Sequence, residues 1–262
     1  MTTLMGQAGF RLLVALGLAL PPALAGAFPS DLVSAFNADH PELALESSPE
    51  AAAAPTEAVH HGNRDGNQVA LTFDACSRWS GNRFNEELVQ WLRDADTPAT
   101  LFLGGRWMYE HPELTRKLHA DPSFELANHA HGHPDLTELE TGEIQVQIGY
   151  AQLMARALTG ETPRFFRPPF VTHDDRVREV AGELGARTIQ YDVASGDADP
   201  DAGPEAIARH VLASVQPGSI VVLHLHDPDL ATAEALPKIL DGLAERGLEP
   251  VTVGELLDED AD

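Results

Sequence analysis

The stretch Phe124-Glu-Leu-Ala-Asn-His-Ala-His-Gly-His-Pro-Asp-Leu136 joins a short apolar run to three alternating histidines. Residues 124–127 are typical of a β-strand, because the run is short and ends at turn-forming residues. His129 and His133 are four residues apart, so both imidazoles can face one point in a helical or turn-like segment. Neutral imidazole nitrogens directed at one point are frequent ligands of divalent metals such as zinc. Histidine-rich fragments also occur for structural reasons, so the cluster by itself leaves that role open.

Outward from this stretch, short apolar runs alternate with helical patterns from Gln68 onward. Strands are expected over residues 69–73, 99–103, 124–127, 165–166, 188–193, 219–223 and 250–253. Helices are expected over residues 85–95, 112–119, 142–158, 174–184, 204–215 and 231–246. This alternation predicts parallel strands joined by right-handed crossovers. The fold class is therefore α/β, and the number of repeats favours a distorted (β/α)7-type barrel, formed as a single domain over residues 67–262.

Polar and titratable residues follow the ends of the expected strands. In chain order they are Asp74, Asn128, His129, His133, Arg167, Asp192, Asp197, His224 and His226. The carboxyl ends of parallel strands meet at one rim of a barrel, where the active sites of such folds lie. The sequence therefore predicts that these side chains share one site.

Composition limits the classes of protein and partner. The chain has 262 residues, 43% of them hydrophobic, and a formal net charge of −24, which argues against nucleic acid and anionic membranes as partners. Cys76 is the single cysteine, so an intrachain disulfide is excluded. A small buried hydrophobe at a strand end is the expected role of Cys76, and a reactive thiol is the alternative.

The N-terminal segment has the features of an export signal. Arg11 precedes an apolar run over residues 12–20, then Pro21-Pro22 and small residues up to Ala25 or Ala27. Residues 1–27 are thus expected to be a signal peptide of a secreted or periplasmic protein, with an uncleaved anchor as the alternative. The run is short for a membrane span, and no stable span is expected after cleavage. Residues 28–66 are expected to form a leader or flexible N-terminal arm, because residues 46–57 contain few side chains that can be buried.

The strand-end segments, in this order, resemble the motifs of the polysaccharide deacetylases of the NodB-homology type, carbohydrate esterase family 4. The resemblance covers roughly residues 68–257. Its matches are Thr72-Phe73-Asp74-Ala75, His129 and His133 followed by Pro134 and Leu136, Arg167 with Pro169 and Phe170, a partial match at Asp192 to Asp197, and Gly218 to His224 with Val222 in a leucine position. The Thr-Phe-Asp-Ala-Cys form looks like a subgroup of the family.

The resemblance implies a secreted, metal-dependent hydrolase that removes N-acetyl or O-acetyl groups from a polysaccharide or peptidoglycan-like glycan. His129 and His133 match the metal ligands, and zinc is the expected ion, with cobalt or nickel as alternatives. Asp74 matches the base and His224 the acid, with His226 as a weaker candidate for the acid. Arg167 is expected to hold Asp74 in place, and Asp197 is expected to orient His224. Pro169 and Phe170 are expected to contact the substrate. His131 is expected to point away from the metal.

Two positions depart from the family pattern. Ala75 stands where the family has an aspartate that binds the metal, and Ala198 stands where an aromatic residue follows the fourth motif. Asp74 could ligate the metal itself, another group such as Asn85, Glu86 or water could replace the missing ligand, or metal binding could be weak. Two alternatives to the deacetylase therefore stay open. One is a catalytically weak or inactive glycan-binding or cell-wall protein, and the other is a hydrolase of a non-sugar amide.

Overall fold

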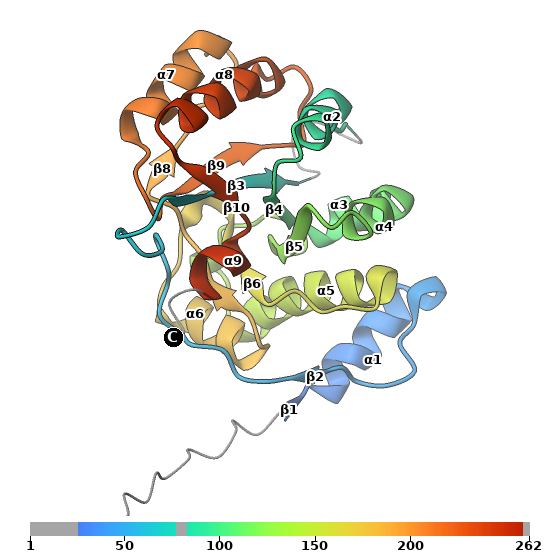
Figure 1. The fold of residues 1–262 in the computed structure, drawn as a ribbon. Coiled ribbons are helices and arrows are strands. Elements are labelled where there is room, and N and C mark those ends of the chain that lie inside the picture. Colours follow the sequence, from blue (N-terminus) through green and yellow to red (C-terminus); the bar gives the residue numbers. More distant parts are fainter. Residues whose placement is uncertain (1–25, 77–82, 259–262) are drawn as a thin grey trace, which may run out of the picture.

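The computed structural model describes residues 26–76 and 83–258 (Figure 1). Most of the expected signal peptide, residues 1–25, lies outside the described residues. Within the described ranges, no helix combines the length and apolarity needed to cross a membrane.

A curled parallel sheet forms the centre of the molecule, with strand order β7-β6-β5-β4-β3-β9-β8 and with β10 beside the beginning of β3. The strands are β3 (Gln68–Ala75), β4 (Ala99–Leu103), β5 (Phe124–Asn128), β6 (Phe165–Phe166), β7 (Arg187–Thr188), β8 (Val193–Ala194), β9 (Ile220–His224) and β10 (Glu249–Val251). Helices lie around this sheet (Figure 1). The expected α/β fold, a distorted (β/α)7-type barrel, is confirmed.

Eight helices surround the sheet in the described part of the chain, and α2, α5 and α6 begin at side-chain caps. They are α2 (Glu86–Asp94), α3 (Gly105–Glu110), α4 (Pro112–His119), α5 (Thr141–Thr159), α6 (Asp175–Glu183), α7 (Pro204–Ser214), α8 (Thr232–Glu245) and α9 (Val253–Asp258). Helix α5 begins with a reciprocal capping box between Glu140 and Glu143. It ends at Gly160, whose φ of 84° is a left-handed conformation that glycine adopts without strain.

The alternation of side chains along β3 separates two layers of the core. Leu71, Phe73 and Ala75 belong to the large cluster that the helices cover, whereas Ala70 belongs to a smaller cluster with Phe102 of β4. Because successive side chains of a strand point to opposite faces, Thr72 and Asp74 share the face of Ala70. This alternation places Asp74 on the inner face of the barrel, at its carboxyl edge.

Two expected strands are wrong in extent. The strand expected over residues 188–193 is two short strands, β7 and β8, which lie at opposite ends of the sheet. Asp192, between them, instead accepts hydrogen bonds from the Ile220 amide and the Ser219 hydroxyl. The strand expected over residues 250–253 ends at Val251, because Thr252 and Glu255 exchange hydrogen bonds at the start of α9. Helix α3 was not expected, since its six residues are too few for a clear periodicity.

The expectation that residues 28–66 form a leader outside the core is wrong for residues 28–36 and for Val59, whereas the described residues of 46–57 are mostly exposed, as expected. Helix α1 (Ser30–Asp39) buries Leu32, Val33 and Phe36 in the large cluster. It packs on α5 at Gly149, where an added Cβ would lie 2.5 Å from Leu32 Cδ2. The segment also contains a short 3-10 turn, η1 (Pro41–Leu43), and the antiparallel pair β1 (Gly26–Ala27) and β2 (Glu50–Ala51).

The same arm continues to β7, at one end of the curled sheet, and to the start of β9, the neighbour of β8 at the other end. The Val59 amide donates to the Thr188 carbonyl at 2.9 Å, and the Gln190 amide donates to the Val59 carbonyl at 2.7 Å, which extends β7 by one parallel bridge. His61 bridges Ser219 at the start of β9, and Arg64 donates to Asp192 at 2.8 Å. Residues 59–64 thus join β7 to β9 across the gap in the barrel, which makes the arm part of the domain.

Candidate active site

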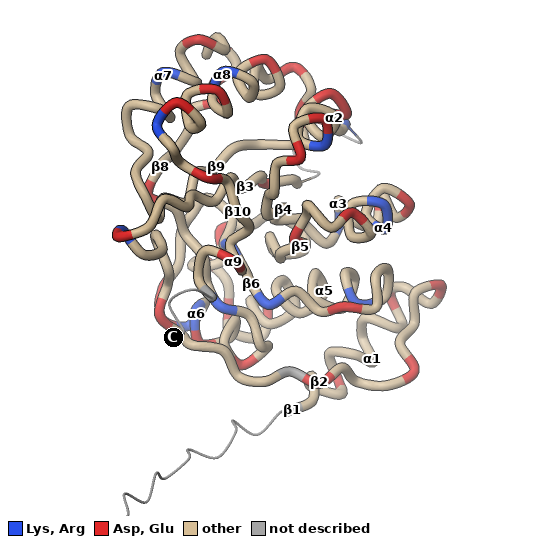
Figure 2. Tube along the Cα trace, viewed as in Figure 1, with Lys and Arg blue, Asp and Glu red and all other residues tan. Residues whose placement is uncertain are grey.

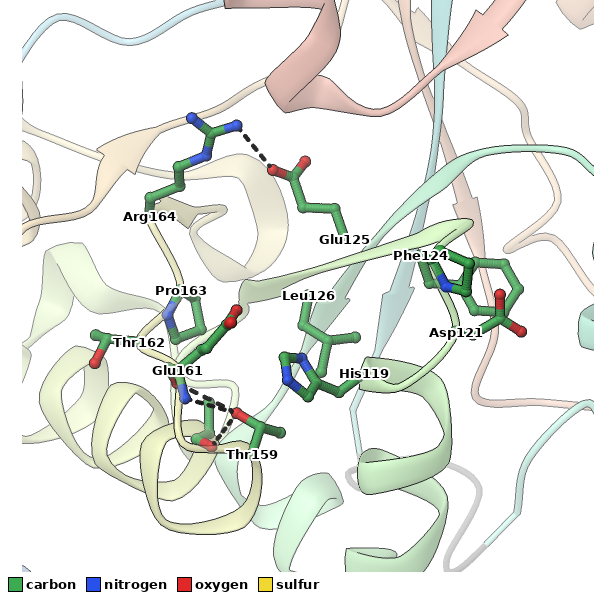
Figure 3. A pocket seen from close by; sticks show the side chains of 12 residues that line it. His119, Asp121, Phe124, Glu125, Leu126, Thr159, Glu161, Thr162, Pro163 and Arg164 are labelled. Carbon is green, nitrogen blue, oxygen red and sulfur yellow. Dashed lines mark hydrogen bonds and ion pairs between the residues drawn. The ribbon is translucent and has the colours of Figure 1, made fainter.

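Two cavities of similar size lie at opposite ends of the strands. One, of about 420 Å³, lies at the amino end of β5, where Glu125 and Arg164 face each other with a 3.4 Å contact (Figure 3). Asp121, also in its lining, is paired with Arg93 at 2.8 Å. The other cavity, of about 440 Å³, lies at the carboxyl ends, and its titratable lining is Asp74, Cys76, His129, His133, Tyr191, His224, His226 and Asp227. Only the second cavity gathers the residues that were predicted from the strand ends.

Asp74, which lines this cavity, forms a buried ion pair with Arg167. Arg167, whose side chain is 0% exposed, donates to Asp74 Oδ1 at 2.8 Å. It also donates to the Thr72 hydroxyl at 2.8 Å and to the Gln190 carbonyl at 3.2 Å, and it lies over the Phe102 ring. Burial raises the pKa of Asp74, but the positive charge of Arg167 outweighs it, with help from His129 and His224, so that the pKa falls below its ordinary value. The carboxylate is therefore held ionised and in one orientation.

His224 and Asp197 form a second pair beside the first. Asp74 and His224 are register partners on the adjacent strands β3 and β9. Asp197 Oδ1 lies 2.8 Å from His224 Nδ1, and the carboxylate also accepts from the His224 amide and from the hydroxyls of Ser195 and Thr232. Burial lowers the pKa of His224, but the hydrogen bond and charge of Asp197 raise it above its ordinary value. His224 thus keeps its proton on the nitrogen that faces Asp197 and presents Nε2 to the cavity.

His129 and His133 lie on the opposite side of Asp74 from this pair. The ring of His129 is 4.9 Å from that of His133, centroid to centroid. His129 Nδ1 lies 2.9 Å from the Arg167 carbonyl oxygen, and because a carbonyl only accepts, this nitrogen carries the proton. His129 Nε2, which lies 3.8 Å from Asp74 Oδ2, keeps its lone pair, and burial lowers the pKa of the ring. The neutral tautomer of His129 is the one that a metal ligand needs.

A divalent metal fits these residues in part. Two imidazoles face one region, and the His129 tautomer suits ligation. Ala75 belongs to the large cluster that the helices cover and does not line the cavity, and its side chain has no atom that could bind a metal. Among residues 26–76 and 83–258, no three histidine, cysteine, aspartate or glutamate side chains are placed to hold one ion. Of the three protein ligands that the resemblance implies, the described residues therefore offer candidates for two, His129 and His133.

The other residues considered from the sequence occupy distinct places. His131 packs against the rings of Tyr150 and His40, away from the cavity, and burial lowers its pKa to about 4. Asn85 caps α2 by accepting from the Leu88 amide, so its side-chain oxygen is committed. Cys76 is buried and lines the cavity.

The loop that carries Phe170 is strained and braced. Phe170 and Val171 have φ values of 57° and 64°, an unfavourable conformation for an aromatic and a β-branched residue. Gln190 donates to the Val171 carbonyl, and the Thr172 hydroxyl donates to Asp135, two residues after His133, at 2.9 Å. Phe170 is thereby held edge-on to His133, with ring centroids 4.7 Å apart, and is 46% exposed. Phe170 lines the cavity, whereas Pro169 is buried beneath the loop.

Two residues at this site, Thr72 and Tyr191, were not predicted from the sequence to have a role there. Thr72 bonds Arg167, and Tyr191 lines the cavity within 5.8 Å of the Arg167 guanidinium carbon. Thr72 could have been found, since it lies two residues before Asp74 and shares its face. Tyr191 could not have been found, because the sequence predicted a continuous strand over residues 188–193, whereas Tyr191 lies in the loop between β7 and β8.

Comparison with known proteins identifies relatives of the whole barrel. The family model described as polysaccharide deacetylase matches residues 61–189. A chitooligosaccharide deacetylase of Sinorhizobium fredii is 31% identical over 191 residues, which cover 68% of this chain and 86% of that protein. An uncharacterised Bacillus subtilis protein is 30% identical over 203 residues, and the chain spans 61% of its length. A Bacillus anthracis structure, described as a pseudoenzyme of carbohydrate esterase family 4, has a TM-score of 0.70 and 27% identity over 86% of this chain and 82% of that one. The chain belongs to the polysaccharide deacetylase family.

Proposed function

We propose that this protein is a secreted or periplasmic hydrolase that removes N-acetyl, or O-acetyl, groups from a polysaccharide or cell-wall glycan. The observation that carries the proposal is the convergence of two buried ion pairs, Asp74 with Arg167 and Asp197 with His224, on one cavity. A water molecule activated by Asp74 would attack the acetyl carbon, the C–N bond would break, and His224 would protonate the leaving amine. The deacetylase relative acts on chitooligosaccharides, as its description states, which supports a glycan substrate.

The charge of the surface is compatible with such a substrate. Acidic positions are distributed over most elements and greatly outnumber basic ones (Figure 2). A strongly anionic polymer would be repelled, whereas a neutral glycan would not.

The divalent metal would be held by His129 and His133, with zinc expected and cobalt or nickel as alternatives. When bound, it would supply polarisation of the acetyl carbonyl and acidification of water. Phe170, exposed beside His133, would contact the sugar. Arg167 would keep Asp74 ionised.

Acetate release tests the proposal directly. Chitooligosaccharides, peptidoglycan and acetylated xylan are each incubated with the protein, with zinc, cobalt or nickel supplied and with a chelator. Acetate is expected from at least one glycan and is expected to fall on chelation. Absence of acetate from all three substrates with every metal would contradict the deacetylase proposal.

Ala75 specifically favours a second candidate, a glycan-binding protein without catalysis. The similar Bacillus anthracis structure is described as a pseudoenzyme, which supports considering this role. Binding of chitooligosaccharides without acetate release under all metal conditions would select it over the deacetylase.

Metal retention is expected to be weak because the part of the chain that the structure describes offers two candidate ligands, His129 and His133, and no third beside them. After dialysis at neutral pH without added metal, zinc measured by plasma mass spectrometry should fall below one ion per chain. Titration with zinc should restore one ion, and His129→Ala should weaken that binding by at least about tenfold. Tight retention of one zinc ion by the His129→Ala variant would rule out this ligand assignment.

The pH dependence should report the pair of His224 and Asp197. Since the pKa of His224 is raised by Asp197 against the effect of burial, the acid stays protonated to a higher pH than an ordinary histidine. The rate, as kcat/KM, should fall as the pH rises through this raised value. Asp197→Asn should move that alkaline limb to lower pH by about one unit or more, and an unmoved limb would show that another group supplies the proton. The same pair stabilises the fold below the ordinary pKa of histidine, and this stabilisation is lost as the pH rises through the raised value.

A further inference from the structure

Gln190, in the loop between β7 and β8, binds three segments that are distant from one another in the sequence. Its backbone amide donates to the Val59 carbonyl of the N-terminal arm at 2.7 Å, and its backbone carbonyl accepts from Arg167 at 3.2 Å. Its side-chain amide donates to the Val171 carbonyl at 3.0 Å. Gln190 is 1% exposed, so its side chain is fixed inside the protein. One buried residue thus links the arm, Arg167 and the loop that carries Phe170.

The side-chain donor of Gln190 is the group that joins this side chain to its surroundings. Its Oε1 atom is buried and has no hydrogen-bond partner among the described residues. An unpaired buried oxygen is unfavourable, and an apolar side chain of similar size would avoid it. The contact that an apolar side chain could not make is the hydrogen bond to Val171. The presence of a glutamine here is therefore accounted for by its bond to the Phe170 loop.

The loop needs such a bond because two of its residues have an unfavourable backbone conformation. Phe170 and Val171 have φ values of 57° and 64°, in the left-handed region that aromatic and β-branched residues seldom adopt. Residues persist in this region where their surroundings hold them. Gln190 holds the Val171 carbonyl, and Asp135 accepts from the Thr172 hydroxyl. Since the bond from Gln190 is made to a strained residue itself, its loss should let the loop relax toward an ordinary φ.

The direction of the Phe170 ring depends on this backbone conformation. The ring lies edge-on to that of His133, with centroids 4.7 Å apart, and it lines the cavity while staying 46% exposed. A change of φ at Phe170 would move the ring relative to the cavity. A ring that is already held in place loses less conformational freedom when a ligand binds, so it binds that ligand more tightly than a mobile ring.

We propose that Gln190 is a positioning residue that holds the Phe170 ring for glycan binding. The inference rests on the proposed function, in which Phe170 contacts the sugar, and deepens it by naming the residue that fixes the ring. Gln190→Met is the variant that isolates this role. Methionine has a flexible side chain of similar length and no side-chain donor, and the backbone bonds to Val59 and Arg167 are kept.

Hydrogen exchange, followed by mass spectrometry of peptides that contain residues 169–173, tests whether Gln190 holds the loop. The Val171 and Thr172 amides, which donate to carbonyls within the loop, should exchange at least about tenfold faster in Gln190→Met. Gln190→Leu, which also lacks the donor, is measured in parallel, so that the result does not depend on one variant. The matched control is Gln90→Met, which removes an exposed glutamine donor on α2 and should leave these amides unchanged. Unchanged exchange in both Gln190 variants would overturn the inference.

Glycan binding tests whether the ring is held for a sugar. N-acetylated chitotriose is titrated calorimetrically into the Asp74→Asn variant, so that binding is measured without turnover. In this background Gln190→Met should weaken binding about three- to tenfold, and Gln90→Met should leave it unchanged. When Phe170→Ala is also present, Gln190→Met should change the affinity by less than about twofold, because Gln190 acts through the Phe170 ring. Affinity that Gln190→Met does not weaken, or weakens equally with and without the ring, contradicts the inference.

The two measurements separate failure of the inference from failure of the proposed function. If the Asp74→Asn parent does not bind chitotriose and the wild-type chain releases no acetate, the proposed function fails. Hydrogen exchange then decides alone whether Gln190 holds the loop. If the parent binds chitotriose and exchange rises without a loss of affinity, the proposed function stands and the inference fails.

Discussion

Asp74→Asn is expected to reduce acetate release by roughly 10²- to 10⁴-fold, the usual contribution of a general base. The amide keeps the shape of the carboxylate and one hydrogen-bond acceptor for Arg167, but it cannot take a proton from water. The measurement is kcat/KM for acetate release from the most active glycan substrate, at a pH where His224 is protonated. The loss should appear in kcat, because the proton transfer occurs only in the transition state.

The control for this prediction is Asp175→Asn. Asp175 lies in the first turn of α6, its side chain is 83% exposed, and it does not line the cavity, so the same chemical change is made outside the site. Its kcat/KM should stay within about twofold of wild type, as is usual for surface changes. If Asp74→Asn keeps more than a tenth of the wild-type rate with its melting temperature unchanged, Asp74 is not the base.

Phe36→Ala is expected to destabilise the protein by about 3–5 kcal/mol, the cost of removing a buried phenylalanine. Phe36 is 0% exposed and packs edge-on against Tyr150 of α5, with ring centroids 5.6 Å apart. The change would leave a cavity between α1 and α5 that the neighbouring side chains cannot fully close. The free energy of unfolding, from chemical denaturation, measures the loss.

Val146→Ala on the same α5 helix is the control, because Val146 is 38% exposed. It should change the free energy of unfolding by less than about 0.5 kcal/mol. If Phe36→Ala were equally mild, α1 would be dispensable, and the arm would be a leader after all. A chain that begins at residue 65 should fail to fold stably for the same reason, since it loses α1 and the Val59 bridge to β7.

The strand ends were predictable because titratable residues directly follow the short apolar runs that indicate strands. Strands β4 and β6 have the expected limits, and Asp74, His129, Arg167 and His224 follow or end the strands that were expected to present them. In a parallel barrel such positions converge whatever the details of packing. Contacts between segments far apart in sequence could not be predicted in this way. The pairing of Val59 with Ile189 rests on two backbone hydrogen bonds. Backbone hydrogen bonds of this kind require no particular side chain, so the sequence does not indicate them.

The sequence by itself determined the fold class, the family resemblance and the set of side chains at the active rim. It could do so because hydrophobic periodicity reports which face of each strand is buried, and motif order reports which strand follows which. Only the tertiary structure decided that Phe28, Leu32, Val33, Phe36 and Val59 of the N-terminal arm are buried, that Ala75 faces the helix layer, and that Arg167 pairs with Asp74 beside the cavity. These features depend on contacts between segments that are far apart in the sequence, and local sequence patterns do not predict such contacts.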